Sequence, residues 1–287
     1  MVELWVYLSL GATLGWGLGQ VAAKRGVSAL GPRKMAAMVA LGEAAVFLSI
    51  YVAFGAPSLG GGRGLLLGLG AGLTGMLGFV AYYETIARGS ISRVGTIIAG
   101  YPVITVLLAV VFLGETISLA QGLGILLLLG SAVLLGRTER ETAGTGGRLL
   151  TILVLLSFLL WGVWGFLVKV AVTELGEGTT FFYFGLSDLM VGIPLLLIIR
   201  ARTSGRILRE RRLLAWPALT IAMGSGAVIL FTLALVDGPA SLVAALTGAY
   251  PVITVLVATT LLRERFTRVD VLAVAAFVVG LLAVVLA

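Results

Sequence analysis

Two acidic residues lie deep inside apolar stretches: Glu43 in MAAMVALGEAAVFLSIYV and Asp188 in FFYFGLSDLMVGIPLLLII. A carboxylate near the centre of a bilayer costs about 2.5–3.5 kcal/mol, so such a residue usually has a partner or a task. Phe47 follows Glu43 by one helical turn, and Phe184 precedes Asp188 by one turn, so each acid shares a helix face with an aromatic ring. This combination suits an ammonium group or a coupling proton. The alternative is that each acid bonds a neighbouring helix and only stabilises the packing.

Three other kinds of residue recur in pairs: a Trp in the middle of an apolar stretch, a Lys two turns after it, and a Tyr-Pro dipeptide. The pairs are Trp16 and Trp161, Lys24 and Lys169, Tyr101 and Tyr250, and Pro102 and Pro251. The aromatic residues are candidates for lining a cavity or for core packing. The lysines either enter a cavity or extend to the membrane surface. The prolines are predicted to kink their helices as gate hinges or as packing features.

The composition indicates that these residues lie in a membrane protein. The chain is 60% hydrophobic and 11% charged, with a mean hydropathy of +1.14. Apolar stretches long enough to cross about 30 Å of hydrocarbon recur from end to end, and they do not alternate as barrel strands do. The chain has no Cys and no His, which excludes disulfides and the usual zinc sites. We therefore expect an all-α polytopic membrane protein that binds no metal, cofactor or nucleic acid.

Ten transmembrane helices are predicted. Their approximate limits are 4–24, 35–54, 64–87, 91–113, 117–136, 149–171, 179–199, 215–236, 240–262 and 269–287. Nearly all of the 20 Lys and Arg residues fall in the loops after odd-numbered spans; the exceptions are Lys24, Arg63 and Lys169. Cytoplasmic loops are enriched in Lys and Arg, so both termini are predicted to be extracellular in a multi-pass protein of the plasma membrane.

An internal repeat relates the two halves of the chain. The heptapeptide YPVITVL occurs at 101–107 and again at 250–256. The Trp pair, the Lys pair and the acid pair Glu43 and Asp188 all have the same spacing in the sequence. This spacing is slightly shorter than that between the two heptapeptides, and a small loop insertion explains the difference. Five is an odd number of spans, so two five-helix repeats must be inverted relative to each other. We expect 1–136 as the first repeat, 137–148 as a linker loop and 149–287 as the second. The alternative is a duplication retained only for stability.

The remaining acids have simpler predicted roles. Glu84 lies one turn before Arg88, the favourable order for an ion pair on a helix surface. Glu115 and Glu264 follow spans 4 and 9, where we expect a structural role. The glycines of span 3 predict close helix packing, because no Lys-Ser or Lys-Thr follows them as in a phosphate-binding loop.

These paired motifs resemble the EamA family of the drug/metabolite transporter superfamily over essentially the whole chain. They are the Trp-Gly pairs with their lysines, and the two prolines followed by Gly114-Glu115 and by Arg263-Glu264. Arg263 departs from the Gly of the family's Gly-Glu motif. The resemblance implies a ten-helix carrier with a central cavity that moves small metabolites such as amino acids, often outward. The family has other residue types where Glu43 and Asp188 stand, so the resemblance does not imply the acid pair.

The sequence thus predicts a secondary transporter that exports amino acids or related amines by alternating access, with possible proton coupling. The predicted substrate-binding residues are Glu43, Asp188, Tyr101, Tyr250, Trp16, Trp161, Lys24, Lys169, Phe47 and Phe184, and the predicted gating residues are Pro102 and Pro251. Because one chain holds both repeats, we expect a monomer in the lipid bilayer. The first alternative is a flippase for lipid-linked headgroups. A membrane-embedded enzyme is disfavoured, because no nucleophile–base pair or metal cluster is evident.

Overall fold

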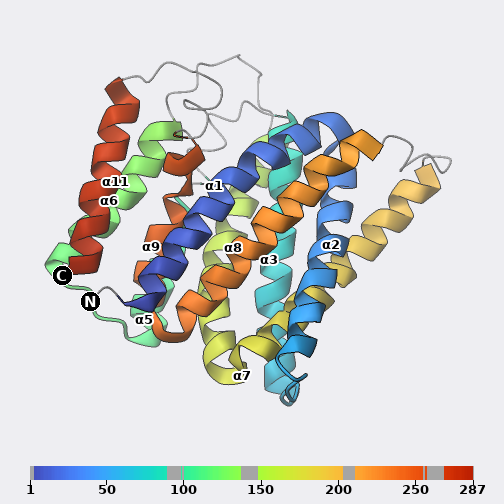
Figure 1. The fold of residues 1–287 in the computed structure, drawn as a ribbon, viewed down its shortest axis with the longest axis horizontal. Coiled ribbons are helices and arrows are strands. Elements are labelled where there is room, and N and C mark those ends of the chain that lie inside the picture. Colours follow the sequence, from blue (N-terminus) through green and yellow to red (C-terminus); the bar gives the residue numbers. More distant parts are fainter. Residues whose placement is uncertain are drawn as a thin grey trace.

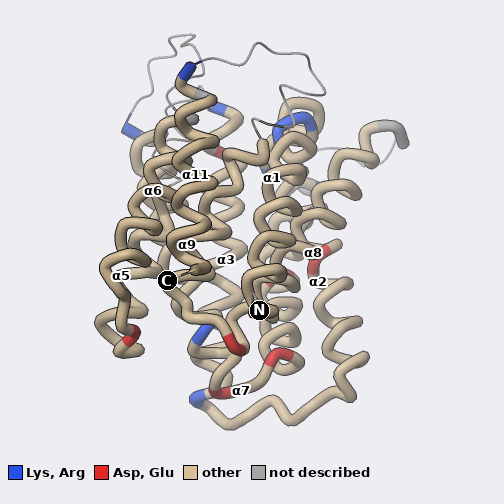
Figure 2. Tube along the Cα trace, turned by 60° about the vertical axis from the view of Figure 1, so that its left-hand side comes forward, with Lys and Arg blue, Asp and Glu red and all other residues tan. Residues whose placement is uncertain are grey.

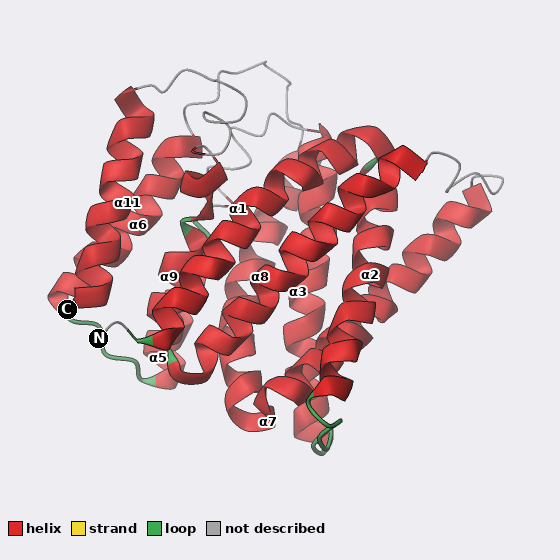
Figure 3. Ribbon diagram, viewed as in Figure 1, coloured by secondary structure: helices red, strands yellow, loops and turns green. Residues whose placement is uncertain are grey.

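A computed structural model describes residues 3–88, 98, 100–136, 148–202, 211–254, 256 and 268–286. These residues form helices joined by short loops (Figures 1 and 3), with no strand among them. The helices are α1 (Leu4–Leu30), α2 (Pro32–Ala53), α3 (Gly62–Arg88), α5 (Pro102–Leu113), α6 (Leu119–Gly136), α7 (Arg148–Arg202), the short 3-10 helix η1 (Arg211–Leu214), α8 (Ala215–Asp237), α9 (Ala240–Gly248) and α11 (Arg268–Leu286).

The described helices confirm the all-helical membrane class but not the count of ten. Four of them are long and apolar enough to cross a membrane: α2, α3, α7 and α8. The described residues contain nine α-helices, because the predicted spans 149–171 and 179–199 lie in the single 55-residue α7. Parts of the predicted spans 91–113 and 240–262 lie outside the described residues. The number ten therefore stays a prediction.

A glycine divides α7 in the same way that a glycine separates α1 from α2. Gly176 has φ 76° and ψ 164°, which is not helical, and Gly31 has φ 83° and ψ 157°. Non-glycine residues rarely adopt this backbone conformation. The offset between the two glycines equals that between Trp16 and Trp161. The break between two helices is thus encoded at equivalent positions of both halves.

Replacing Gly176 with Ala is expected to destabilise the protein by about 1–3 kcal/mol, because only the backbone conformation is strained. No atom lies within 4 Å of the position that the new Cβ would take. Gly130 in α6 is the matched control, since its Cβ position is equally empty and its φ is not positive. Gly130→Ala should leave stability unchanged or raise it slightly. Thermal unfolding in detergent measures both, and equal effects would contradict the backbone explanation.

Small residues let α3 pack closely along α7. A Cβ at Gly68 would lie 2.1 Å from the Tyr183 ring, and one at Gly78 would lie 2.4 Å from the Trp161 ring. Between them, Gly72 faces Ser187. The prediction of close packing at these glycines is confirmed. The packing also fixes the indole of Trp161 against the backbone of α3, which matters for the site below.

Contacts between helices occur in reciprocal pairs that follow the repeat. Thr254 Oγ1 donates a hydrogen bond of 3.0 Å to the Gly17 carbonyl. Its counterpart Thr105 donates one of 2.7 Å to the Gly162 carbonyl. Two glycine contacts are related in the same way. Gly72 contacts Ser187, and the equivalent residues Ile221 and Gly42 also contact each other. Each half therefore packs its first and second helices against the third and fourth helices of the other half.

Equivalent helices of the two halves run in opposite directions. Figure 1 shows α6 and α11 side by side, with α6 leading away from the end where both termini lie and α11 returning to it. In Figure 2 most described Lys and Arg residues gather at the opposite end, which we call the basic end. The end that carries the termini is called the terminal end. The described structure thus has a strong asymmetry of basic charge along the bundle.

The Gly-Glu motif after α5 has a structural role. Gly114 ends α5 in the left-handed conformation at φ 67°. Glu115 then accepts hydrogen bonds from the backbone N–H groups of Ala240 and Ser241, at 2.6 and 2.9 Å, and from the Ser241 hydroxyl. These donors begin α9, whose own N-cap residue, Pro239, makes no side-chain cap. The carboxylate therefore caps a helix of the other half, which agrees with the structural role predicted for Glu115. Glu264 lies outside the described residues.

Glu115→Ala is expected to lower the free energy of unfolding by about 2 kcal/mol, because it leaves helix-terminal donors of α9 without their charged acceptor. Glu174→Ala is the control at the same end of the bundle. Glu174 pairs with Arg63, whose side chain is 79% exposed, so its loss should cost less than about 1 kcal/mol. Thermal unfolding compares the two, and an equal or larger effect at Glu174 would contradict the capping role.

Candidate functional site

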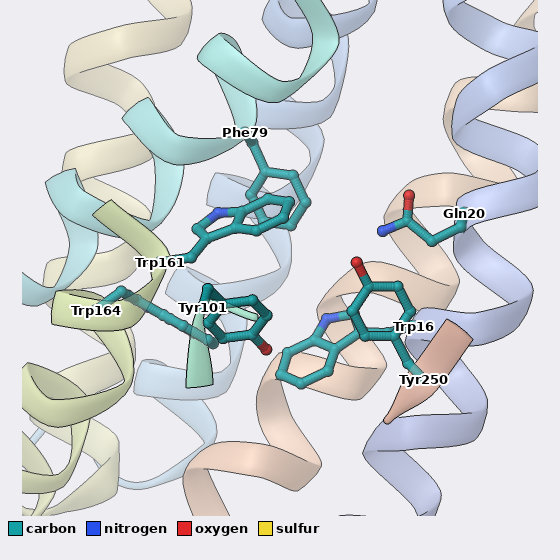
Figure 4. Close-up of a pocket in the computed structure, with 7 residues that line it drawn as sticks. All are labelled: Trp16, Gln20, Phe79, Tyr101, Trp161, Trp164 and Tyr250. Carbon is teal, nitrogen blue, oxygen red and sulfur yellow. The ribbon is translucent and has the colours of Figure 1, made fainter. Parts of the chain in front are cut away.

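A small aromatic pocket lies inside the bundle (Figure 4). Its lining residues come from α1, α3, α7 and the chain next to α5 and α9: Trp16, Gln20, Phe79, Tyr101, Trp161, Trp164 and Tyr250. All four aromatic residues that the repeat had paired, the two Trp and the two Tyr, are brought together here. Figure 4 shows Trp16, Gln20 and Tyr250 facing the other four side chains across the pocket.

The two tyrosines reach the pocket from breaks in the helices. Pro102 is the first residue of α5, directly after Tyr101. Pro251 follows the turn at Ala249 that ends α9, and residues 250–254 are again helical. Neither proline is described as a kink inside a continuous helix, as the sequence had suggested; each stands in the first turn of a helical segment, where a missing N–H is tolerated. Their predicted role in gating remains a prediction.

The two tryptophans of the repeat differ in their hydrogen bonding. Trp161 Nε1 donates to the Gly75 carbonyl at 3.3 Å, and its ring packs against Tyr101 at 5.8 Å between centroids. Trp16 Nε1 is buried and has no hydrogen-bond partner. A buried donor without a partner costs free energy unless something else occupies the site. The Trp16 side of the pocket therefore offers a free indole N–H.

Gln20 adds a second polar group on that side. Its Oε1 accepts a hydrogen bond of 2.6 Å from the Tyr82 hydroxyl, which orients the amide. Figure 4 shows the amide nitrogen directed toward the pocket. Gln20 follows Trp16 by one helical turn, so both lie on the same face of α1. This face presents two N–H donors to whatever occupies the pocket.

The two acids line a small neighbouring cavity, which shares Phe79 and Trp164 with the aromatic pocket. Glu43 and Asp188 are each 4% exposed. Among the described residues neither forms an ion pair with Lys or Arg, and Asp188 Oδ2 is buried without a hydrogen-bond partner. A third small cavity is lined by Glu43 together with Trp16 and Gln20. The acids and the aromatic pocket thus lie in adjacent cavities with common lining residues, which together we call the central site.

Phenylalanine rings close this site on the side of the terminal end. Phe47 stacks on Phe181 at 6.0 Å between centroids and meets Phe184 edge-on at 5.7 Å. All three rings are buried. The predicted arrangement of Phe47 and Phe184 beside the acids is present, since both line the cavity with Glu43 and Asp188. In this conformation the aromatic rings separate the acids from the terminal end.

The structure places the two lysines outside the central site. Lys24 is exposed on α1. Lys169 donates hydrogen bonds to the Leu235 and Gly238 carbonyls, at 2.8 and 3.1 Å, so its ammonium caps the C-terminal end of α8. Neither contributes to the cavities that hold the acids. Their inclusion among the substrate-binding residues finds no support in the described contacts.

The predicted ion pair of Glu84 is present, and the carboxylate has a second arginine partner that was not predicted. Arg88 bonds the Glu84 carboxylate as predicted, and Arg33 of α2 also contacts it at 3.1 Å. The long-range partner could not be read from the sequence, because it depends on how α2 packs beside α3.

Sequence reasoning did not identify Gln20, Phe79 or Trp164 as site residues. Two of them carried a usable signal. Gln20 is a polar residue within an apolar stretch one turn after Trp16, and Trp164 follows Trp161 on the same helix face. Phe79 had no signal, because a single Phe in an apolar helix is equally suited to face lipid.

Comparison with known proteins relates this arrangement to a family. One solved structure, described only as "Crystal structure of protein", superimposes with a TM-score of 0.78 at 18% identity, covering 100% of this chain and 98% of that chain. At this identity the likeness shows the fold alone. No curated protein matches the chain. The model of the EamA-like transporter family matches twice, at residues 3–137 and 149–286. With both matches spanning the paired helices around the central pocket, this chain is an integral membrane protein of the EamA-like transporter family.

Proposed function

We propose that the protein is a secondary transporter that exports amino acids or related amines by alternating access, with possible proton coupling. The observation that carries the proposal is the junction of an aromatic pocket with two buried acids that have no described cationic partner. Family membership supports transport as such. The side chains of the site support the substrate class.

The substrate class follows from the distribution of polar groups around the site. Glu43 and Asp188 can receive an ammonium group, because two carboxylates without cations lie beside aromatic faces. The indole N–H of Trp16 and the amide of Gln20 can donate to a carboxylate or hydroxyl. An α-amino acid carries both groups on one carbon. In the absence of substrate a proton on either acid would relieve the charge, which supports exchange of a proton for an organic cation.

Alternating access is supported by the two halves of the fold. Reciprocal contacts such as Thr254 with Gly17 and Thr105 with Gly162 give the halves equivalent packing. The opposite directions of α6 and α11 agree with inverted repeats. In an inverted pair, rocking one bundle against the other opens a central site first to one side and then to the other. One chain suffices for this motion, which favours a monomer.

Solute counterflow in liposomes tests the proposed function. Purified protein is reconstituted with an unlabelled internal solute, and uptake of the labelled solute is followed for a panel of amino acids, amines, organic acids and neutral sugars. We expect counterflow for amino acids or amines, and stimulation by an opposing proton gradient. Counterflow confined to acids or sugars would contradict the assignment of the acids to ammonium binding. Movement of lipid-linked headgroups without solute counterflow would instead support a flippase.

The basic end is proposed to be cytoplasmic, with both termini extracellular. The chain has no native Cys, so single cysteines report cleanly. Ser28 lies in the last turn of α1 and Ser58 in the loop between α2 and α3, and both serines are exposed. Figure 1 shows the end of α1 at the basic end and the loop between α2 and α3 at the terminal end. In intact cells an impermeant thiol reagent should modify Ser58→Cys and spare Ser28→Cys until the membrane is permeabilised. The reverse pattern would invert the topology.

A further inference from the structure

One open cavity of the described structure has no part in the proposed transport site. It lies where α1 meets α2, beside the C-terminal ends of α3 and α7. It shares no lining residue with the three central cavities. Its position is at the basic end, where α1 leads into α2 (Figure 1). A separate ligand is therefore considered for it.

The cavity wall carries three cationic side chains and one acid. Arg33, Lys34 and Arg88 line it together with Glu84. The single carboxylate contacts both arginines, through Oε1 to Arg33 Nε and through Oε2 to Arg88. A guanidinium has five N–H donors, so each arginine keeps donors that Glu84 does not use. The wall carries a net positive charge, which the carboxylate of Glu84 offsets only in part.

The rest of the wall is apolar. Leu30, Ile198 and Ile199 line the same cavity, and Ile198 is 47% exposed. A cavity with cations on one side and aliphatic side chains on the other fits a ligand that is itself divided into an anionic and an apolar part. A small hydrated anion would gain nothing from the apolar wall.

The equivalent place in the other half lacks this charge. The repeat pairs Gly31 with Gly176, which have the same backbone conformation. The positions equivalent to Arg33 and Lys34 are then Gly178 and Thr179, and no cation replaces them. The helix junction is thus shared by both halves, whereas its basic lining occurs only at the basic end. The charge is a property of this membrane face and not of the fold.

We propose that this cavity binds an anionic phospholipid of the leaflet at the basic end. The phosphodiester lies among Arg33, Lys34 and Arg88, and an acyl chain passes Leu30 and Ile198. Phosphate accepts hydrogen bonds from arginine in fork geometry, and basic pockets at membrane surfaces attract anionic headgroups. Glu84 opposes the phosphate charge and so limits the affinity.

Thermal unfolding of the purified, delipidated full-length chain in detergent tests the proposal by titration with three ligands. Phosphatidylglycerol should stabilise the protein more than phosphatidylcholine of the same chains. Glycerol phosphate, which has an anionic phosphate but no chains, should have no effect at the same concentration. Equal effects of the two lipids, or an equal effect of glycerol phosphate, would overturn the lipid site.

Three variants place the effect in this cavity. The double variant Arg33→Gln and Arg88→Gln should weaken phosphatidylglycerol binding about 30-fold, the loss of two charges. Arg63→Gln, at the opposite end of α3, is the matched control and should bind as the wild type does. Glu84→Gln should bind more tightly than the wild type, because the competing charge is gone. Unchanged selectivity in the double variant, or weaker binding in Glu84→Gln, would contradict the proposal even if either variant is less stable without lipid.

Discussion

Glu43→Gln and Asp188→Asn are each expected to reduce counterflow of an amine or amino acid by about 30-fold or more. Each variant removes a carboxylate that meets the substrate ammonium inside a buried site, and truncating one partner of such a pair costs about 2–5 kcal/mol. The exchanged side chains have nearly the same shape, so the cavity they line with Phe47 and Phe184 is kept. The initial rate of counterflow is measured against substrate concentration and external pH.

Stability separates this role from a packing role. Asp188 Oδ2 lies buried without a hydrogen-bond partner, so replacing the acid by an amide removes no described bond of that oxygen and eases the burial of charge. The variants should therefore unfold at the wild-type temperature or above it. If each acid instead bonds a neighbouring helix, the variants lose stability and keep their transport. Wild-type rates and pH dependence in both folded variants would show that the acids are structural. Glu174→Gln, on the Arg63 pair, serves as the control for loss of one acid.

The second large effect is expected at Trp16, and it should differ from the effect at Trp161. Trp16→Phe keeps an aromatic ring in the pocket and removes a buried N–H that has no partner in the protein. We expect the apparent affinity for an amino acid to fall about 10-fold or more, because a hydrogen bond to a charged carboxylate is lost. The affinity for the corresponding decarboxylated amine should change little. Counterflow with the matched amino acid and amine measures the difference.

Trp161→Phe is the internal comparison. This change breaks the bond of 3.3 Å to the Gly75 carbonyl and leaves unfilled space beside Gly78, so it should lower the free energy of unfolding by about 1–2 kcal/mol. Trp16→Phe should not lower it. Equal losses of stability in both variants, with unchanged amino acid affinity in Trp16→Phe, would remove the assignment of the Trp16 indole to substrate.

The class of the fold could be predicted from the sequence because bilayer physics constrains it locally. Each apolar stretch must satisfy its own backbone hydrogen bonds as a helix. The repeat pairing was likewise available from residue spacing alone. This pairing matched Trp16 with Trp161 and Tyr101 with Tyr250, and the structure shows that all four residues line one pocket. Glu43, Asp188, Phe47 and Phe184 were also selected by position and helix face, and they line one cavity.

Only the tertiary structure decided which partner each of these residues meets. Equivalent residues of the repeat proved unlike: Lys24 is exposed, whereas Lys169 bonds the end of α8, and Trp161 has an acceptor where Trp16 has none. The neighbours come from helices far away in the chain, so local spacing carries no record of them. The contact of Arg33 with Glu84 and the cap that Glu115 places on α9 have the same origin. The sequence alone determined the helical membrane class and the helix face on which each of these residues lies; packing between the halves decided which of their polar atoms have partners within the protein.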